Sequence, residues 1–245
     1  MANIPVTERK YMLAEKKDET PEVLILKFMP EDGKPTPFDP GMFMMITGVD
    51  GAGKRYTARA FSIASDPSTP GLEFMIIKEP KHGDHLGTSH FISAKVGDTF
   101  MLKGPNGQFR FDPSVNKKVM FIAGGTGLAP FISMLRHIKV TGSGSDVVLI
   151  YSTKFSTEII AKDELNGYVK DLGLKLVVTV TRPQQGGGWT GQTGHVDAAM
   201  ISKYARDFAE RTFYICGPLP FVQAVKDAIT ALKVPPERVK ADVWG

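Results

Sequence analysis

Lys-Val-Met-Phe-Ile-Ala-Gly-Gly-Thr-Gly-Leu-Ala-Pro occupies residues 118–130 and joins an apolar run to closely spaced glycines and a proline. The apolar run predicts a buried strand. Pro130 is typical of the first turn of a helix, where its missing N–H costs nothing. Gly125 and Gly127 leave backbone N–H groups open to a phosphate, which a helix N-terminus also attracts. We therefore expect a strand, a phosphate-binding turn and a helix; a glycine-rich turn without a ligand is the alternative.

The residues after Pro113 continue this alternation of strands and helices. Apolar runs and helical spacing predict strands at 118–123, 147–151, 174–180 and 212–216, and helices at 130–138, 158–170, 196–205 and 218–232. Apolar strands separated by helices indicate a parallel sheet covered on both faces. The carboxyl ends of such strands share one edge, where ligands bind. Gly124, Thr181-Arg182 and Cys216-Gly217 fall at that edge.

The residues before Pro113 have a different pattern. Short apolar runs are separated by Gly- and Pro-rich breaks, and they predict strands at 23–28, 42–47, 59–64, 72–78 and 99–103. This spacing favours an antiparallel β-barrel or a sandwich, with one short helix at 88–94. We therefore predict a two-domain chain, with a β-barrel domain over residues 1–113 and an α/β domain with a parallel sheet over residues 114–245.

Composition excludes several classes of protein. The chain has 245 residues, of which 42% are hydrophobic and 23% charged, so it is neither disordered nor fibrous. The net charge of +4 is spread along the chain, so we expect no nucleic-acid partner. No apolar run approaches the roughly 20 residues of a transmembrane helix, and the N-terminus lacks an apolar signal core, so we expect a cytoplasmic protein.

Cys216 is the only cysteine, which leaves no thiolate cluster for zinc or iron–sulfur. The histidines at 82, 85 and 90 lack partners at ligand spacing, so we predict no metal site. Any iron–sulfur centre that works with this chain is therefore expected on another chain.

Three further motifs accompany the glycine turn. They are Arg59-Ala60-Phe61-Ser62 on a predicted strand, Cys216-Gly217-Pro218 after another, and the C-terminal Asp242-Val243-Trp244. Taken singly, each has a plain alternative: a surface arginine beside a core phenylalanine, a buried structural cysteine, and a frayed tail.

Together and in this order, the motifs resemble the ferredoxin–NADP reductase superfamily, which includes cytochrome b5 reductases and oxygenase reductase components. The resemblance covers nearly the whole chain. Supporting matches are Pro40-Gly41-Met42-Phe43, Val96-Gly97-Asp98 and Lys103-Gly104-Pro105-Asn106-Gly107-Gln108-Phe109. The resemblance implies that the barrel domain binds flavin and that the α/β domain binds a pyridine nucleotide.

The resemblance also implies roles for the flavin residues. Arg59 would pair with the FAD phosphates, Phe61 would lie against the isoalloxazine, and the Ser62 hydroxyl would face its N5. Phe61 stands where the family commonly has tyrosine. Thr88 would start a short helix that receives the pyrophosphate. The remaining flavin contacts would come from Ile63, Ile76, Ile77, Lys78 and Gly87.

On the nucleotide side, the resemblance assigns Gly125, Thr126, Gly127 and Pro130 to the pyrophosphate loop, and Cys216, Gly217 and Pro218 to the nicotinamide pocket. Trp244 would cover the flavin, and the catalytic residues would be Ser62, Cys216 and Asp242. Arg182 follows the third strand, and Lys154 follows the second, where either could pair with a 2′-phosphate. We therefore favour NADP(H), while NADH stays possible.

The implied function is a flavin-dependent oxidoreductase. It would transfer hydride between NADP(H) and FAD, bound across a cleft between the halves, and exchange single electrons with ferredoxin, flavodoxin or a heme protein. The alternatives are an NADH-dependent reductase component of an oxygenase or heme-protein system, and a flavin-binding electron-transfer subunit that turns over no nucleotide. A dinucleotide sensor would have no use for Arg59, Phe61, Ser62 and Trp244.

Overall fold

The chain folds into two units. The computed structural model describes residues 3–49, 55–78, 88–183 and 188–244. They divide into a first unit, Met1–Asp112 with Ile132–His137, and a second unit, Pro113–Phe131 with Ile138–Gly245.

The first unit is built on a six-stranded antiparallel sheet, in the order β4-β3-β6-β1-β2-β5, that curls into a nearly closed barrel. Its elements are β1 (Thr7–Thr20), β2 (Val23–Pro30), β3 (Phe43–Gly48), β4 (Arg59–Ser62), β5 (Leu72–Ile77), α1 (Thr88–Ser93) and β6 (Thr99–Asn106). The prediction of an antiparallel barrel is confirmed.

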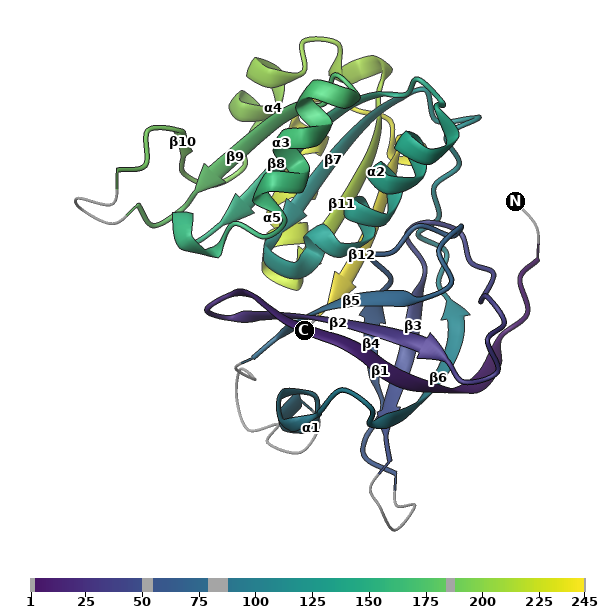
Figure 1. Ribbon diagram of the computed structural model, residues 1–245. Helices are drawn as coiled ribbons and strands as arrows, with labels where there is room; N and C mark the ends of the chain where they lie inside the picture. The colour runs from purple at the N-terminus through teal and green to yellow at the C-terminus, as the bar shows by residue number, and fades with distance from the viewer. Residues whose placement is uncertain (1–2, 50–54, 79–87, 184–187, 245) are drawn as a thin grey trace. The chain divides into compact units, whose positions relative to one another are not determined.

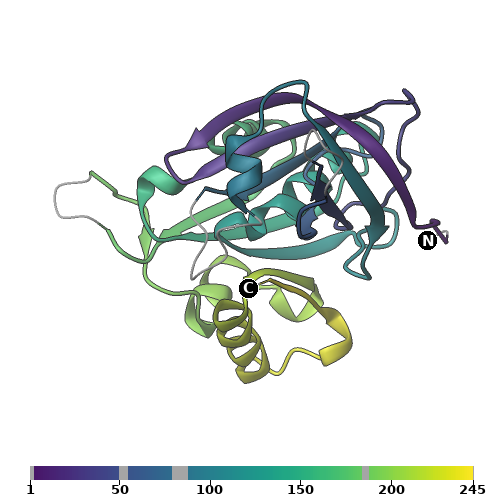
Figure 2. The same cartoon turned by 90° about the horizontal axis from the view of Figure 1, so that it is seen from below.

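Aromatic side chains fill the barrel because alternate residues of each strand face inward. The ring of Phe28 meets those of Phe74 and Phe100 edge to face, with centroids 5.8 and 5.0 Å apart. Outside this core, α1 lies beside β1, where the Lys16 ammonium donates to the carbonyl of Ala94 at 2.9 Å (Figure 2). Lys16 thus satisfies a carbonyl just past the helix end.

Strand β1 is absent from the sequence-based expectation. It pairs with β2 and β6 and is the longest strand of the first unit. Few of its side chains, such as Tyr11 and Leu13, are fully buried, and the run of charges at Glu15–Glu19 hides its period. The pairing register with β2 shifts between Leu13 and Glu15, which interrupts the alternation further.

The second unit contains a six-stranded parallel sheet in the order β10-β9-β8-β7-β11-β12, with helices on both faces (Figure 1). Its strands are β7 (Lys118–Gly124), β8 (Asp146–Thr153), β9 (Lys175–Val180), β10 (Gln192–Thr193), β11 (Thr212–Pro218) and β12 (Val239–Trp244). Its helices are α3 (Lys162–Asp171), α4 (Ala198–Tyr204), α5 (Leu219–Ala231) and the two ends of α2 (Ala129–Thr141), whose residues 132–137 belong to the first unit. The predicted parallel α/β sheet is confirmed.

Each face of the parallel sheet has its own apolar layer. On one face, Val222 and Ile229 of α5 belong to a buried cluster with Ile122 and Ile215 of the sheet. On the other, the Phe121 ring stacks on Phe131 of α2, with centroids 4.8 Å apart. Burial on both faces explains why the strand sequences are continuously apolar.

One sequence-based expectation needs correction in the second unit, and one alternative is excluded. The helix predicted at 158–170 begins only at Lys162, because Ala161 adopts a left-handed conformation (φ 52°) and breaks the preceding turn. The Tyr151 hydroxyl accepts the backbone N–H of Ile160 at 3.3 Å and fixes this break. The C-terminus is no frayed tail, since Val239–Trp244 pairs along β11 as an edge strand.

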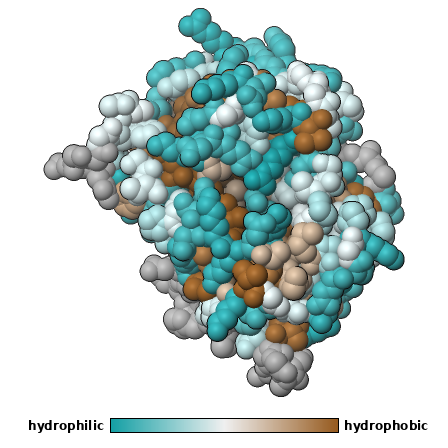
Figure 3. Space-filling view, viewed as in Figure 1, coloured by the Kyte–Doolittle hydropathy of each residue, from teal (hydrophilic) through white to brown (hydrophobic). Residues whose placement is uncertain are grey.

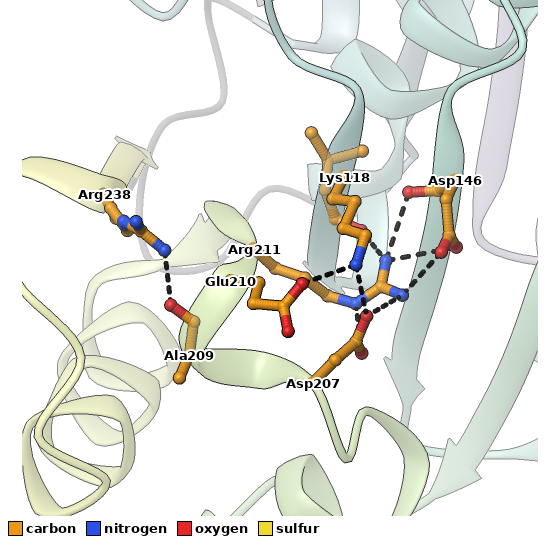
Figure 4. Close-up of polar contacts among 8 residues, drawn as sticks. Lys118, Asp146, Asp207, Ala209, Glu210, Arg211 and Arg238 are labelled. Carbon is orange, nitrogen blue, oxygen red and sulfur yellow. Dashed lines mark hydrogen bonds and ion pairs between the residues drawn. The ribbon is translucent and has the colours of Figure 1, made fainter.

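A buried arginine ties together the amino ends of three strands. Arg211 precedes β11, is fully buried, and donates to both carboxylate oxygens of Asp146 and Asp207 at 2.8–3.2 Å (Figure 4). It also donates to the Val119 carbonyl at 3.1 Å. The Arg211 guanidinium is the main cause of a lowered pKa at Asp207. Beside these contacts of Arg211, Lys118 pairs with Glu210, and this pairing raises the pKa of Lys118.

Apolar and hydrophilic side chains both occur at the surface of the molecule. Single apolar residues are mixed with hydrophilic ones on the face shown in Figure 3, which is ordinary for protein surfaces. Within the described residues, no helix is long and apolar enough to cross a membrane.

Candidate functional site

The glycine turn of the second unit forms a cradle made of backbone. Gly125 opens a 3₁₀ turn, Gly125–Leu128, that leads directly into α2, and its φ is 56°. A Cβ on Gly125 would meet no atom within 4 Å, so the space above the turn is open. A Cβ on Gly127 would lie 2.3 Å from the carbonyl oxygen of Cys216. The turn therefore needs glycine for its conformation at one position and for close approach at the other.

This cradle fits a dinucleotide pyrophosphate. An open surface above a turn at the start of a long helix presents backbone N–H groups and the positive end of the helix dipole. Gly125, Thr126, Gly127 and Pro130 are the residues predicted for this role, and all four lie on this turn or in the first turn of α2.

Phe221 lies beside the glycine turn, a position that the sequence analysis did not single out. Its ring, in the first turn of α5, lies where a Cβ on Gly124 or on Gly217 would come within 2.7–2.8 Å of it. The ring therefore packs on the ends of both β7 and β11. The cue in the sequence was a phenylalanine three residues after Pro218. Its helical spacing, however, predicts only a residue of the hydrophobic core.

Cys216, Gly217 and Pro218 form the carboxyl end of β11, next to β12. The pairing register puts Cys216 opposite Asp242 and Pro218 opposite Trp244. The structure thus brings together two motifs that the sequence only suggested were related.

Burial shifts the pKa values of the two facing groups Cys216 and Asp242 in the same direction. Burial, and secondarily the charge of Asp242, raises the pKa of the Cys216 thiol well above its usual range. Burial also raises the pKa of Asp242, an effect that the backbone N–H of Val243 partly opposes. A neutral, fully buried thiol can pack against a flat ring but is a poor nucleophile.

The adjacent strands β8 and β9 end in exposed cations. Arg182 and Lys154 are both exposed, and the Arg182 N–H donates to the Lys154 carbonyl at 2.9 Å, so the two loops run together. A carboxylate lies near them as well. Glu158 approaches the Thr153 hydroxyl at 3.3 Å, although its position in the sequence did not predict an acid at this strand end.

The flavin motif forms β4 of the first unit. Arg59, Phe61 and Ser62 are all partly exposed, and the Phe61 ring meets Phe91 edge to face at 5.3 Å. The strand pairs with β3, where Ser62 is opposite Phe43. Phe61 thus has a supported ring with part of its surface open, which suits stacking on a flat cofactor.

The other predicted flavin residues divide by burial. Ile63 and Ile76 are fully buried in the barrel core, so only their backbone groups could meet a cofactor. Lys78 is held by Asp18 and by the Thr20 carbonyl at 3.1 Å, and Ile77 is partly exposed beside it. Thr88 begins α1, as predicted, and Gly87 lies outside the described residues.

Helix α1 is seated on a glycine of β3. The His90 ring stacks on Tyr56 with centroids 4.1 Å apart, and a Cβ on Gly48 would come within 2.0 Å of that ring. Gly48 therefore makes room for His90. Among the described residues, no group of three or more His, Cys, Asp and Glu side chains could hold a metal ion.

Replacing Gly48 with alanine is expected to displace His90 and α1, and so to weaken FAD binding about tenfold, equal to about 1.4 kcal/mol. FAD titration of the apoprotein, followed by flavin fluorescence, measures this. Gly33→Ala is the control, since a Cβ there meets no atom within 4 Å, although Gly33 has a positive φ of 69° and Gly48 does not. Equal FAD affinities of the two variants would contradict the role of Gly48.

Comparison with known proteins identifies the two units. Residues 10–111 match the family of oxidoreductase FAD-binding domains, and residues 121–227 match the family of oxidoreductase NAD-binding domains. The chain belongs to the ferredoxin reductase-like flavoprotein reductases. The family resemblance drawn from the sequence motifs is confirmed, and the chain carries an FAD-binding and an NAD-binding domain in the predicted order.

Individual relatives agree with this family. The reductase subunit of stachydrine N-demethylase from Rhizobium meliloti is 29% identical over 87% of this chain and 60% of that protein. The glycine betaine monooxygenase reductase subunit from Pseudomonas aeruginosa is 30% identical over 77% of this chain and 51% of that protein. The chain therefore spans between half and two thirds of the length of these relatives.

A solved structure shows the same fold. The FAD/NAD-binding domain of nitric oxide dioxygenase from Vibrio cholerae superposes with a TM-score of 0.84 at 21% identity, covering 97% of this chain and 98% of that one.

Proposed function

We propose that this chain is an NAD(P)H-dependent flavoprotein reductase that passes electrons between NADP(H) and a protein partner through FAD. The observation that carries the proposal is the glycine cradle at Gly125–Gly127, on an NAD-binding domain, in a chain that also has an FAD-binding domain. Bound FAD would supply the redox chemistry, taking up a hydride and releasing electrons singly.

The protein's own groups bind and orient. Arg59 would neutralise cofactor phosphate charge, Phe61 would pack on the flavin ring, and the Ser62 hydroxyl would donate a hydrogen bond to the reacting part of the ring. Cys216 shapes the nicotinamide pocket as a neutral thiol, which its burial favours. Burial also raises the pKa of Asp242 at the same strand pair, which eases protonation of its carboxyl group relative to an exposed aspartate.

NADPH is the proposed donor, with NADH as the second candidate. The cations Lys154 and Arg182, on adjoining loops, would bind a 2′-phosphate. Glu158 is the opposing feature, because a carboxylate near the ribose repels a phosphate. Measuring kcat/KM with each nucleotide decides between them.

The partner is proposed to be a small redox protein such as a ferredoxin, a flavodoxin or a heme protein. Relatives described as reductase subunits of stachydrine N-demethylase and glycine betaine monooxygenase favour a second candidate, a reductase component of an oxygenase system. Cytoplasmic location stays a prediction.

Purified protein is expected to be yellow with FAD and to bleach when NADPH is added without oxygen. Yellow protein that neither NADPH nor NADH bleaches would favour an electron-transfer subunit. Colourless protein that contains nucleotide but no flavin would favour a dinucleotide sensor.

Replacing Ser62 with alanine is expected to slow hydride transfer about 10- to 100-fold, because one oriented hydrogen bond to the reacting ring is lost, while FAD stays bound. Anaerobic stopped-flow reduction of the flavin measures this rate. Ser93→Ala, at an exposed serine of the same unit, is the control. Equal reduction rates in wild type and Ser62→Ala would remove Ser62 from the mechanism.

A further inference from the structure

Three side chains on one face of α2 face the segment that follows the flavin motif. The segment is residues 64–66, two positions after Ser62. Residues 132–137 of α2 belong to the same unit as the barrel. Ser133, Arg136 and His137 are three and four positions apart, which places them on one side of the helix.

Each of three consecutive residues is bound by one of these side chains. The Arg136 guanidinium donates to the Ala64 carbonyl at 3.0 Å, and the Ser133 hydroxyl donates to the Ser65 carbonyl at 2.7 Å. The His137 Nδ1 lies 2.9 Å from a carboxylate oxygen of Asp66. The helix therefore fixes both the backbone and a side chain of this short segment.

A second set of contacts ties the segment to β5. Arg136 also pairs with the Glu73 carboxylate at 2.7 Å. The Glu73 carbonyl accepts the Ala64 N–H at 2.8 Å, and its own N–H donates to the Ser65 hydroxyl at 3.1 Å. Arg136 thus joins two neighbouring chain segments at one point.

The Ser133 and Asp66 ends of these contacts are shielded from water. The side chains of Arg136 and His137 are about a quarter exposed. Ser133 is fully buried and Asp66 is 2% exposed. The second carboxylate oxygen of Asp66 accepts the Ser68 N–H at 2.8 Å, so the carboxylate is held from both sides. Charge-assisted hydrogen bonds of this kind are stronger and more directional than exposed ones.

We propose that Ser133, Arg136 and His137 are positioning residues that set the place of Ser62 and Phe61 against the flavin. Only Ile63 separates Ser62 from the anchored segment, and its N–H is bonded to the Met42 carbonyl at 3.0 Å. The side chain of Ile63 is fully buried, so the strand cannot absorb a shift of residue 64 locally. Movement of the anchored segment therefore reaches Ser62. The inference rests on the proposed function, because it requires bound FAD.

The test uses the full chain with FAD. Arg136→Met, Ser133→Ala and His137→Leu are compared with wild type by FAD titration, by the flavin absorption spectrum and by the midpoint potential of bound FAD. Arg136→Met is expected to weaken FAD binding about tenfold and to shift both the absorption bands and the potential. Ser133→Ala removes a single hydroxyl and keeps the test usable if larger changes prevent folding.

Two controls separate positioning from general stability. Lys139→Met removes a cation of the same helix that pairs with Asp171 at the surface, so the flavin spectrum and potential should keep wild-type values. His137→Asn keeps an N–H donor for Asp66 and should restore the potential that His137→Leu alters.

The outcomes are distinct. Wild-type protein that takes up no FAD would overturn the proposed function, and the positioning role with it. Wild-type protein that binds FAD, together with variants that lose thermal stability but keep the wild-type spectrum and potential, would overturn the positioning role alone.

Discussion

Replacing Gly127 with alanine is expected to lower the free energy of unfolding by about 3 kcal/mol, because the added Cβ meets backbone atoms that cannot rotate away. It would lie 2.3 Å from the Cys216 carbonyl oxygen, 2.6 Å from its carbon and 2.8 Å from the Gly217 Cα. The loop and the end of β11 must therefore separate. Because both belong to the proposed nucleotide site, NAD(P)H binding is expected to weaken at least about tenfold.

Denaturant unfolding and titration with NADP⁺ measure the two effects. Gly167→Ala is the matched control, since that glycine lies in α3 with no atom within 4 Å of the added Cβ. Alanine there is expected to raise stability by about 0.5–1 kcal/mol through its helix propensity. Gly125→Ala adds a second comparison for the free energy of unfolding. Its Cβ would meet no atom within 4 Å, so the expected cost is that of a left-handed backbone at alanine. If Gly127→Ala bound NADP⁺ as wild type does, the close approach would have no part in nucleotide binding.

Local patterns predicted much of this fold. The parallel sheet was visible because strands such as Lys118–Gly124 are buried on both faces and read as continuous apolar runs. Strand β1 was not visible, because its stability comes from pairing with two neighbours rather than from its own apolar residues. The start of α3 was misplaced because the left-handed Ala161 has no signature in composition.

The candidate site was likewise predictable from the sequence only in part. The glycine at position 127 indicated from the sequence that another part of the backbone comes close to it. The structure shows that this part is the Cys216 carbonyl. The pairing of Asp242 with Cys216 was beyond sequence reasoning, because it depends on the register that brings two residues 26 positions apart in sequence face to face. The contacts of Arg136 with Ala64 and Glu73 depend equally on tertiary structure.

Replacing Arg211 with methionine is expected to lower the free energy of unfolding by about 3 kcal/mol, because the carbonyl and two carboxylates around a buried guanidinium lose their shared donor. Methionine fills much of the volume of the arginine side chain. The loss of stability therefore reflects the missing hydrogen bonds and charge more than a new cavity. Thermal and denaturant unfolding measure it. Arg238→Met is the control, since the Arg238 side chain donates to the Ala209 carbonyl in the same region (Figure 4) and lies nearer the surface than Arg211. A change below about 0.5 kcal/mol is expected.

The pH dependence of that difference identifies its cause. Arg211 lowers the pKa of Asp207 in the folded chain, so ionised Asp207 stabilises the fold above its unfolded pKa of about 3.9. This contribution is lost as the pH falls through the lowered folded value. In Arg211→Met the pKa of Asp207 is no longer lowered by a guanidinium. The gap in stability between wild type and variant should therefore be largest near neutral pH and should narrow below about pH 4. A gap that stayed constant through this range would mean that Arg211 acts through packing alone, with the carboxylates contributing nothing to its effect.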